Sequence, residues 1–142
     1  MRFVLDASLA LSWFFEDERD DFATAALYHL REFGALVPNL WCVEIGNGLV
    51  VAERRKRIDG QRVATIVADL SSLPVSVEET GETVAFSQVA VARAFRLTNY
   101  DATYLDLARR HRLLLATRDK QLAAAADGAG LLWKPVRWRK PR

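Results

Sequence analysis

Short apolar runs alternate with longer amphipathic stretches along most of this sequence. Runs of three or four apolar residues bounded by turn signals are typical of buried strands, and a strict apolar–polar alternation is typical of half-buried ones. Five segments are predicted as strands on this basis: Phe3–Leu5 and residues 35–37, 74–77, 113–116 and 131–133.

The stretches between these runs carry the three-to-four-residue apolar spacing of amphipathic helices. Helices are predicted for residues 41–57, 61–70, 82–95, 102–111 and 120–126, and a further helix, capped by Ser8, is expected after the first strand has stopped at Asp6. Ser8 and Thr80 are expected to cap two of these helices. Strands that alternate with helices imply parallel pairing, so the predicted fold is α/β, a three-layer α/β/α sandwich with a mainly parallel central sheet.

The composition fits one compact domain of 142 residues with a real core, because 51% of the residues are hydrophobic. We expect a domain over residues 1–133 and a basic tail over residues 134–142. The single cysteine, Cys42, excludes an intrachain disulfide and is expected to be a small core residue. No apolar stretch is long enough to cross a membrane, and the acidic cluster after residue 15 argues against an export signal, so a cytoplasmic location is expected.

Two acidic residues directly follow predicted strands. Asp6 comes after the first strand, and Asp119 lies just past residues 113–116, with Thr117 between the strand and Asp119. Ligands of open α/β sheets bind outside the carboxyl ends of the strands. The two carboxylates are therefore expected to face one crevice. The alternative for each, taken alone, is a helix cap.

Two further acids lie on predicted helices. Glu44 occupies a helix face that is otherwise apolar or small, where a carboxylate is costly unless it is paired or bound to a cation, and Asn47 lies one turn further on. Asp101 precedes a helix, which suits either the site or an N-cap. Asp106, on the same helix, has arginines three and four positions later and is expected only to support the site.

Four converging carboxylates repel one another strongly. Two charges 4 Å apart repel by about 4 kcal/mol at an effective dielectric constant near 20. Either some of the carboxylates are protonated or a divalent cation lies between them. Ligands that are all oxygen favour Mg²⁺, with Mn²⁺ as a substitute, and such an ion suits phosphodiester hydrolysis.

The acidic positions, taken in order, resemble those of PIN-domain ribonucleases, in particular the VapC toxins of toxin–antitoxin pairs. The resemblance rests on four segments: residues 6–8 after the first strand, residues 41–47 around Glu44, residues 100–105 and residues 116–120. It implies a Mg²⁺-dependent endoribonuclease with Asp6, Glu44, Asp101 and Asp119 as catalytic and metal-binding residues, supported by Ser8 and Thr117. It also implies an RNA substrate, a homodimer and a cognate antitoxin that blocks the site.

Two alternatives stay open at this point: a PIN-fold module that binds RNA without cleaving it, and a housekeeping PIN nuclease without an antitoxin. Four clustered negative charges give a binding module for a polyanion no advantage, which favours the nuclease. The tail adds a separate hypothesis, because basic residues around a tryptophan suit contact with phosphates and an unpaired base. The residues concerned are Arg137, Trp138, Arg139 and Lys140.

Overall fold

The computed structural model describes residues 1–79 and 85–136, and its centre is a parallel sheet. Its strands are β1 (Phe3–Leu5), β2 (Ala35–Pro38), β3 (Val75–Glu78) and β4 (Leu115–Ala116), in the order β3-β2-β1-β4 with every neighbouring pair parallel. Every residue of β1, β2 and β4 is buried, which explains their continuous apolar sequences, whereas β3 at the edge is partly exposed.

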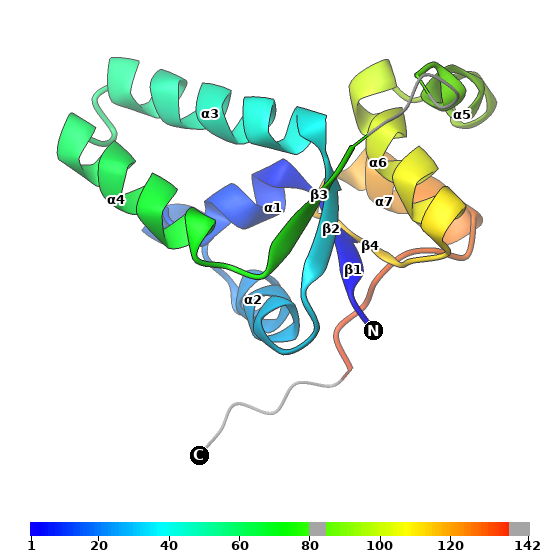
Figure 1. Cartoon of the computed structure of the whole chain (residues 1–142), viewed down its shortest axis with the longest axis horizontal. Coiled ribbons are helices and arrows are strands. Elements are labelled where there is room, and N and C mark those ends of the chain that lie inside the picture. Colours follow the sequence, from blue (N-terminus) through cyan, green and yellow to red (C-terminus); the bar gives the residue numbers. More distant parts are fainter. Residues whose placement is uncertain (80–84, 137–142) are drawn as a thin grey trace.

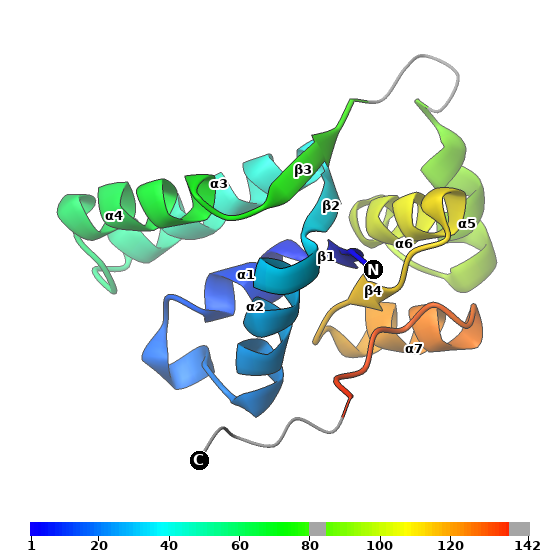
Figure 2. The same cartoon turned by 60° about the horizontal axis from the view of Figure 1, so that its bottom comes forward.

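Helices cover both faces of this sheet and make it the middle of three layers (Figure 1). Figure 2 shows the same separation, with α1 to α4 on one side of the sheet and α5 to α7 on the other. The α-helices of the described residues are α1 (Ala7–Ser12), α2 (Asp21–Phe33), α3 (Asn39–Arg54), α4 (Gly60–Ser71), α5 (Ser87–Phe95), α6 (Asn99–His111) and α7 (Lys120–Gly128). The predicted α/β/α sandwich is thus confirmed.

Several local predictions were wrong. No helix was predicted for the segment that forms α2. This helix is capped by Asp20, whose carboxylate accepts a hydrogen bond from the Ala23 amide. Ser8 does not cap α1, because that helix already begins at Ala7. Residues 131–133 form no strand but a single bridge between Leu115 and Leu132.

Two helices begin elsewhere than the sequence indicated. α6 begins at Asn99, and its capping side chain is that of Thr98, which accepts a hydrogen bond from the Asp101 amide. The Asp101 carboxylate therefore does not serve as the N-cap. α5 begins at Ser87; residues 82–84 and Thr80, which were expected to begin and cap this helix, lie outside the described residues.

In the layer formed by α1 to α4, α1 and α3 approach each other closely. A Cβ atom at Gly48 in α3 would lie 2.5 Å from Leu11 Cδ1, whereas one at Gly46 would meet nothing within 4 Å. The absence of a side chain at Gly48 therefore lets the two helices pack closely. This contact matters for the site, because α1 directly follows Asp6 and α3 carries Glu44.

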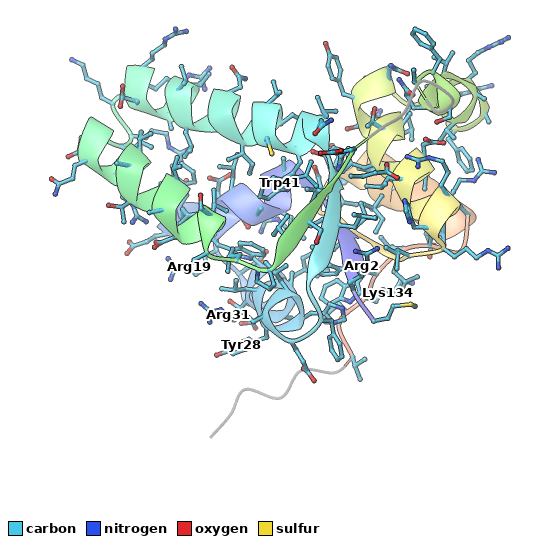
Figure 3. All side chains as sticks on the ribbon, viewed as in Figure 1. Arg2, Arg19, Tyr28, Arg31, Trp41 and Lys134 are labelled. Carbon is cyan, nitrogen blue, oxygen red and sulfur yellow. The ribbon has the colours of Figure 1, made fainter. Side chains whose placement is uncertain are left out.

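Cys42 is exposed, so its expected place in the core was wrong. It lies on α3 beside the buried Trp41, at the rim of an apolar groove of about 330 Å³ that α3 forms with α4 and β3. Figure 3 labels Trp41, whose indole nitrogen has no hydrogen-bond partner among the described residues. No helix within residues 1–79 and 85–136 is long and apolar enough to cross a membrane.

Candidate active site

Asp6 is a buried carboxylate at the carboxyl end of the central strand β1. Its side chain is 7% exposed, and its Oδ2 accepts hydrogen bonds from the hydroxyls of Ser8 at 2.9 Å and Thr117 at 2.8 Å. Burial raises the pKa of this carboxyl above its ordinary value, the two hydroxyl bonds oppose that rise, and the nearby Asp119 adds to it. The Asp6 carboxyl is therefore largely desolvated and is held in a fixed orientation.

Asp119 lies beside Asp6 because β4 pairs with β1. The Asp6 amide donates to the carbonyl of Ala116 at 3.0 Å, and the Asp119 amide donates to the Thr117 hydroxyl at 3.1 Å. One oxygen of Asp119 also caps α7 by accepting from the Leu122 amide at 2.8 Å. Capping and proximity to Asp6 are thus compatible, since a carboxylate has two oxygens.

Glu44 faces the same end of the sheet from α3. Its Oε1 accepts a hydrogen bond from the Tyr104 hydroxyl at 2.6 Å. Burial raises the pKa of Glu44, the bond from Tyr104 opposes the rise, and the charges of Asp6 and Asp101 reinforce it. Tyr104, only 1% exposed on α6, escaped the sequence analysis because its apolar neighbours mark it as a core residue.

Asp101 lies in the first turn of α6. Burial raises the pKa of its carboxyl, and the charges of Asp119 and Asp6 raise it further. Since Thr98 caps the helix, the Asp101 carboxylate is not engaged as the cap. Its place in the first helical turn also lets the helix dipole stabilise its negative charge.

The four carboxylates act on one another electrostatically. Asp119 influences Asp6 and Asp101, and Asp6 and Asp101 both influence Glu44. Their all-oxygen donor set suits Mg²⁺ or Mn²⁺ in its chemistry. Within the part of the chain that the structure describes, however, no three such side chains are gathered closely enough to hold a metal ion as they stand. Binding of an ion would therefore require the carboxylates to move towards one another.

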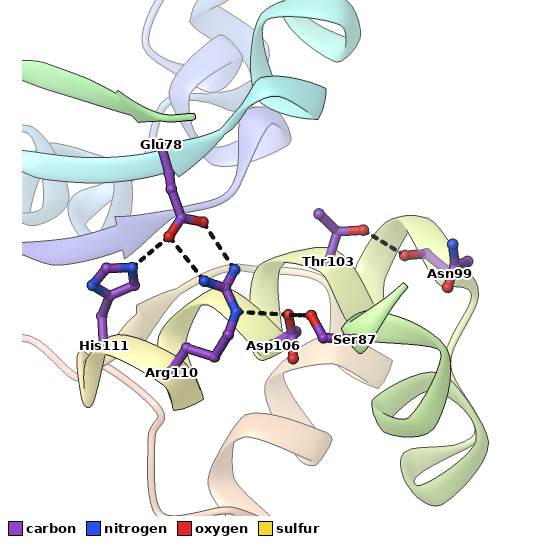
Figure 4. Close-up of polar contacts among 7 residues, drawn as sticks. All are labelled: Glu78, Ser87, Asn99, Thr103, Asp106, Arg110 and His111. Atoms are coloured by element: carbon purple, nitrogen blue, oxygen red, sulfur yellow. Dashed lines mark hydrogen bonds and ion pairs between the residues drawn. The ribbon is translucent and has the colours of Figure 1, made fainter. Parts of the chain in front are cut away.

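Two of the expected supporting residues lie apart from this cluster. Asn47 is exposed, and in the described residues no hydrogen bond joins it to Glu44. Asp106 accepts hydrogen bonds from Ser87 Oγ at 2.6 Å and Arg110 Nε at 2.9 Å. Figure 4 shows that Arg110 continues to Glu78 on β3, so Asp106 belongs to a network that joins α6 to the sheet edge.

The tail residues named by the sequence, Arg137, Trp138, Arg139 and Lys140, lie outside the described residues. The chain leading to them is anchored at Trp133, which is 6% exposed and packs edge-on against Phe3 and Phe22 at centroid distances of 5.3 and 5.6 Å. The division into residues 1–133 and 134–142 stays a prediction.

Comparison with known proteins identifies a matching family and similar solved structures. The family model of the PIN domain matches residues 3–128, a range that includes all four acids. Among solved structures, the chain is similar to PAE2754 from Pyrobaculum aerophilum, with 24% identity, a TM-score of 0.64, and coverage of 90% of this chain and 88% of that chain. It is also similar to a toxin–antitoxin complex from Klebsiella pneumoniae, with 20% identity, a TM-score of 0.66, and coverage of 94% of this chain and 98% of that chain. At these identities the structural likeness shows the fold alone. No curated protein matches the sequence.

Proposed function

Since this chain belongs to the PIN domain family, whose fold is a nuclease fold, we propose that it is a Mg²⁺-dependent endoribonuclease toxin. The observation that carries the proposal is the set of four mutually repelling carboxylates, Asp6 and Asp119 after the carboxyl ends of β1 and β4, Glu44 on α3 and Asp101 in the first turn of α6. Three of them have raised pKa values. Such a set is costly to the fold alone and is useful where a divalent cation offsets it.

Each carboxylate has a definite task in this proposal. Asp6, Glu44, Asp101 and Asp119 hold the ion, which supplies Lewis-acid activation of a phosphodiester and of the attacking water. Ser8 and Thr117 fix the orientation of Asp6 through their bonds to Oδ2. Tyr104 donates a hydrogen bond to Glu44 that lowers the pKa of this carboxyl against the effect of burial and so favours its charged form.

Replacement of Asp6 tests the catalytic role directly. Asp6→Asn is nearly isosteric and keeps acceptors for Ser8 and Thr117, but it removes the charge, so cleavage of RNA by the purified protein with Mg²⁺ is expected to disappear while the fold persists. Asp127→Asn, the same change at an exposed position on α7, is the matched control. Retention of most of the nuclease rate by Asp6→Asn would contradict a metal-binding role for Asp6.

The toxin assignment extends the proposal from chemistry to biology. One structural neighbour is a toxin–antitoxin complex, which supports a cognate antitoxin as partner. The homodimer and the cytoplasmic location of the proposed toxin rest on the sequence analysis. Expression of the chain alone is expected to arrest a bacterial host, and expression of Asp6→Asn is not. Harmless expression of a folded and active nuclease would instead point to a housekeeping PIN nuclease.

A non-catalytic RNA-binding module is the competing function. It predicts RNA binding that is insensitive to Mg²⁺ and no cleavage under any metal. The Asp6→Asn comparison separates the two, because a binding module gains affinity for RNA when a negative charge is removed but has no activity to lose.

A further inference from the structure

Two adjoining hollows lie over α2, away from the four carboxylates of the candidate active site. The first, which we call the aromatic hollow, has a volume of about 450 Å³ and includes Arg2, His29, Phe33 and Lys134 in its lining. The second, the arginine hollow, has a volume of about 540 Å³ and is lined in part by Arg19, Arg31 and Arg62. Tyr28 lines both hollows, so they form one continuous surface.

The aromatic hollow offers ring surfaces to solvent. The His29 ring lies between those of Phe3 and Phe33, with centroid distances of 4.6 and 4.7 Å. Phe33 is 45% exposed and Tyr28 is 49% exposed. Exposed rings supported by further rings are suited to stacking with an unpaired base, a contact that contributes about 1–3 kcal/mol.

The arginine hollow carries positive charge that the protein itself does not neutralise. Neither Arg19 nor Arg31 forms an ion pair within the described residues, and Arg62 makes only a long bond of 3.4 Å to the carbonyl of Phe14. By contrast, Arg57, Arg110 and Arg118 are paired with carboxylates elsewhere. The lining of the two hollows includes only two acidic side chains, Glu32 and Asp69.

This surface lies at the opposite end of the sheet from the candidate active site. Met1, Phe3 and Leu114 line the aromatic hollow at the amino ends of β1 and β4, whereas Asp6 and Asp119 follow the carboxyl ends of these strands. Figure 3 shows Arg19, Tyr28 and Arg31 on one side of α2 and Arg2 and Lys134 on its other side. A ligand that engages both ends must pass around the molecule.

From this geometry we infer that the two hollows form a binding surface for single-stranded RNA, separate from the site of cleavage. Phosphates contact Arg19, Arg31 and Arg62, and an unpaired base stacks on Phe33. The inference rests on the proposed function, because it adds a second contact region for the same substrate class. It also restricts that substrate, since only an RNA long enough to span the sheet reaches both regions.

The test measures RNA affinity in a protein that cannot degrade the probe. In an Asp6→Asn background, fluorescence anisotropy of a labelled single-stranded oligouridine is compared with and without Arg19→Glu and Arg31→Glu together. The double replacement is expected to weaken binding at least about tenfold and to reduce the slope of log affinity against log salt by about 1.4, because each lost phosphate contact removes about 0.7. Phe33→Ala is expected to weaken binding about tenfold without changing this slope.

The matched control reverses the charge of two exposed arginines that line neither hollow, Arg54 on α3 and Arg93 on α5. Arg54→Glu with Arg93→Glu changes the net charge equally, so equal losses in both double variants would show a general charge effect and overturn the inference. Displacement of the RNA by poly-glutamate as effectively as by unlabelled oligouridine would also overturn it, in favour of an acidic protein segment as the ligand.

Failure of this inference is distinguishable from failure of the proposed function. If the unsubstituted protein cleaves RNA with Mg²⁺ but the Arg19 and Arg31 replacements leave affinity unchanged, the separate binding surface is wrong and the nuclease remains. If the unsubstituted protein cleaves no RNA, the proposed function fails, whatever the binding experiment gives.

Discussion

A single buried hydroxyl lowers the pKa of one carboxyl in the candidate active site. The Tyr104 hydroxyl donates to Glu44 at 2.6 Å and lowers the pKa of that carboxyl against the effect of burial. In Tyr104→Phe the pKa of Glu44 is expected to rise further, so the acid limb of the pH–activity profile moves to higher pH. About tenfold more Mg²⁺ is expected for half-maximal cleavage, because a hydrogen bond to a charged group contributes about 1.5–3 kcal/mol.

Tyr100→Phe is the control for this replacement, since Tyr100 lies on the same helix and is 66% exposed. Thermal melting shows whether Tyr104→Phe keeps the packing of the ring. An unchanged acid limb and an unchanged Mg²⁺ dependence in a folded Tyr104→Phe protein would refute the positioning role of this hydroxyl.

Single residues were accessible to sequence reasoning where their chemistry conflicts with their surroundings. Glu44 stood out because a carboxylate on an apolar helix face is energetically costly unless it is paired or bound to a cation. Tyr104 did not, since tyrosine among apolar residues is ordinary core, and its partner lies 60 positions away. Asn47 was expected to support Glu44 from one turn along the helix, but it is exposed, because neighbours in sequence compete with partners brought in by tertiary packing.

At the scale of elements, one ion-pair network joins the edge strand β3 to α6. Arg110 contacts Glu78 at 2.8 Å and Asp106 at 2.9 Å, with at most 26% of any of these side chains exposed (Figure 4). Arg110→Met keeps the aliphatic stem but leaves two largely buried carboxylates without their cation. The free energy of unfolding is expected to fall by about 2–3 kcal/mol, somewhat below the cost of breaking a fully buried pair.

The stability that Arg110→Met loses should depend on pH in a definite direction. The bonds from Arg110 and His111 lower the pKa of Glu78 below its ordinary value of 4.5. A carboxyl with a lowered folded pKa stabilises the protein above its unfolded pKa and loses that effect as pH falls through the folded pKa. Denaturant unfolding of Arg110→Met and of the unsubstituted protein is therefore expected to differ most at pH 6–7, to begin to converge below about pH 4.5, and to agree once the pH lies below the lowered pKa of Glu78. Arg93→Met, at an exposed position on α5, should match the unsubstituted protein, and a pH-independent difference would contradict the argument.

Element types followed from hydrophobic spacing better than element ends did. The buried strands β1 and β2 are continuous apolar runs that the sequence displays directly. α2 was missed although its buried residues Ala23, Ala26 and Leu30 follow the spacing of an amphipathic helix. The start of α6 was misplaced because both Thr98 and Asp101 are good capping residues, and only the backbone geometry decides between them.

At the scale of the whole molecule, Mg²⁺ is expected to stabilise the native state. The ion offsets repulsion among carboxylates that the fold brings near one another, and the unfolded chain lacks this arrangement. At 100 times the dissociation constant the gain is about 2.7 kcal/mol. Differential scanning calorimetry in millimolar Mg²⁺ against EDTA, at matched ionic strength, measures it.

The same scan on Asp6→Asn serves as the control, since losing one carboxylate weakens binding of the ion and reduces the shift. An identical melting temperature with and without Mg²⁺ in the unsubstituted protein would contradict binding of the ion to the native fold in the absence of RNA.

The place of β1 in the sheet has a consequence for the order of events during synthesis. β1 is the first strand made, yet it lies between β2 and β4, and Asp6 takes one of its two hydroxyl partners from Thr117, 111 positions later. A ribosome adding about 5–20 residues per second needs roughly 6–22 s to make that interval. Until then the acidic residues are on separate parts of a nascent chain. A polypeptide whose proposed target is RNA therefore completes its acidic cluster only after the ribosome has passed Asp119, so most of the domain is made before the proposed nuclease centre exists.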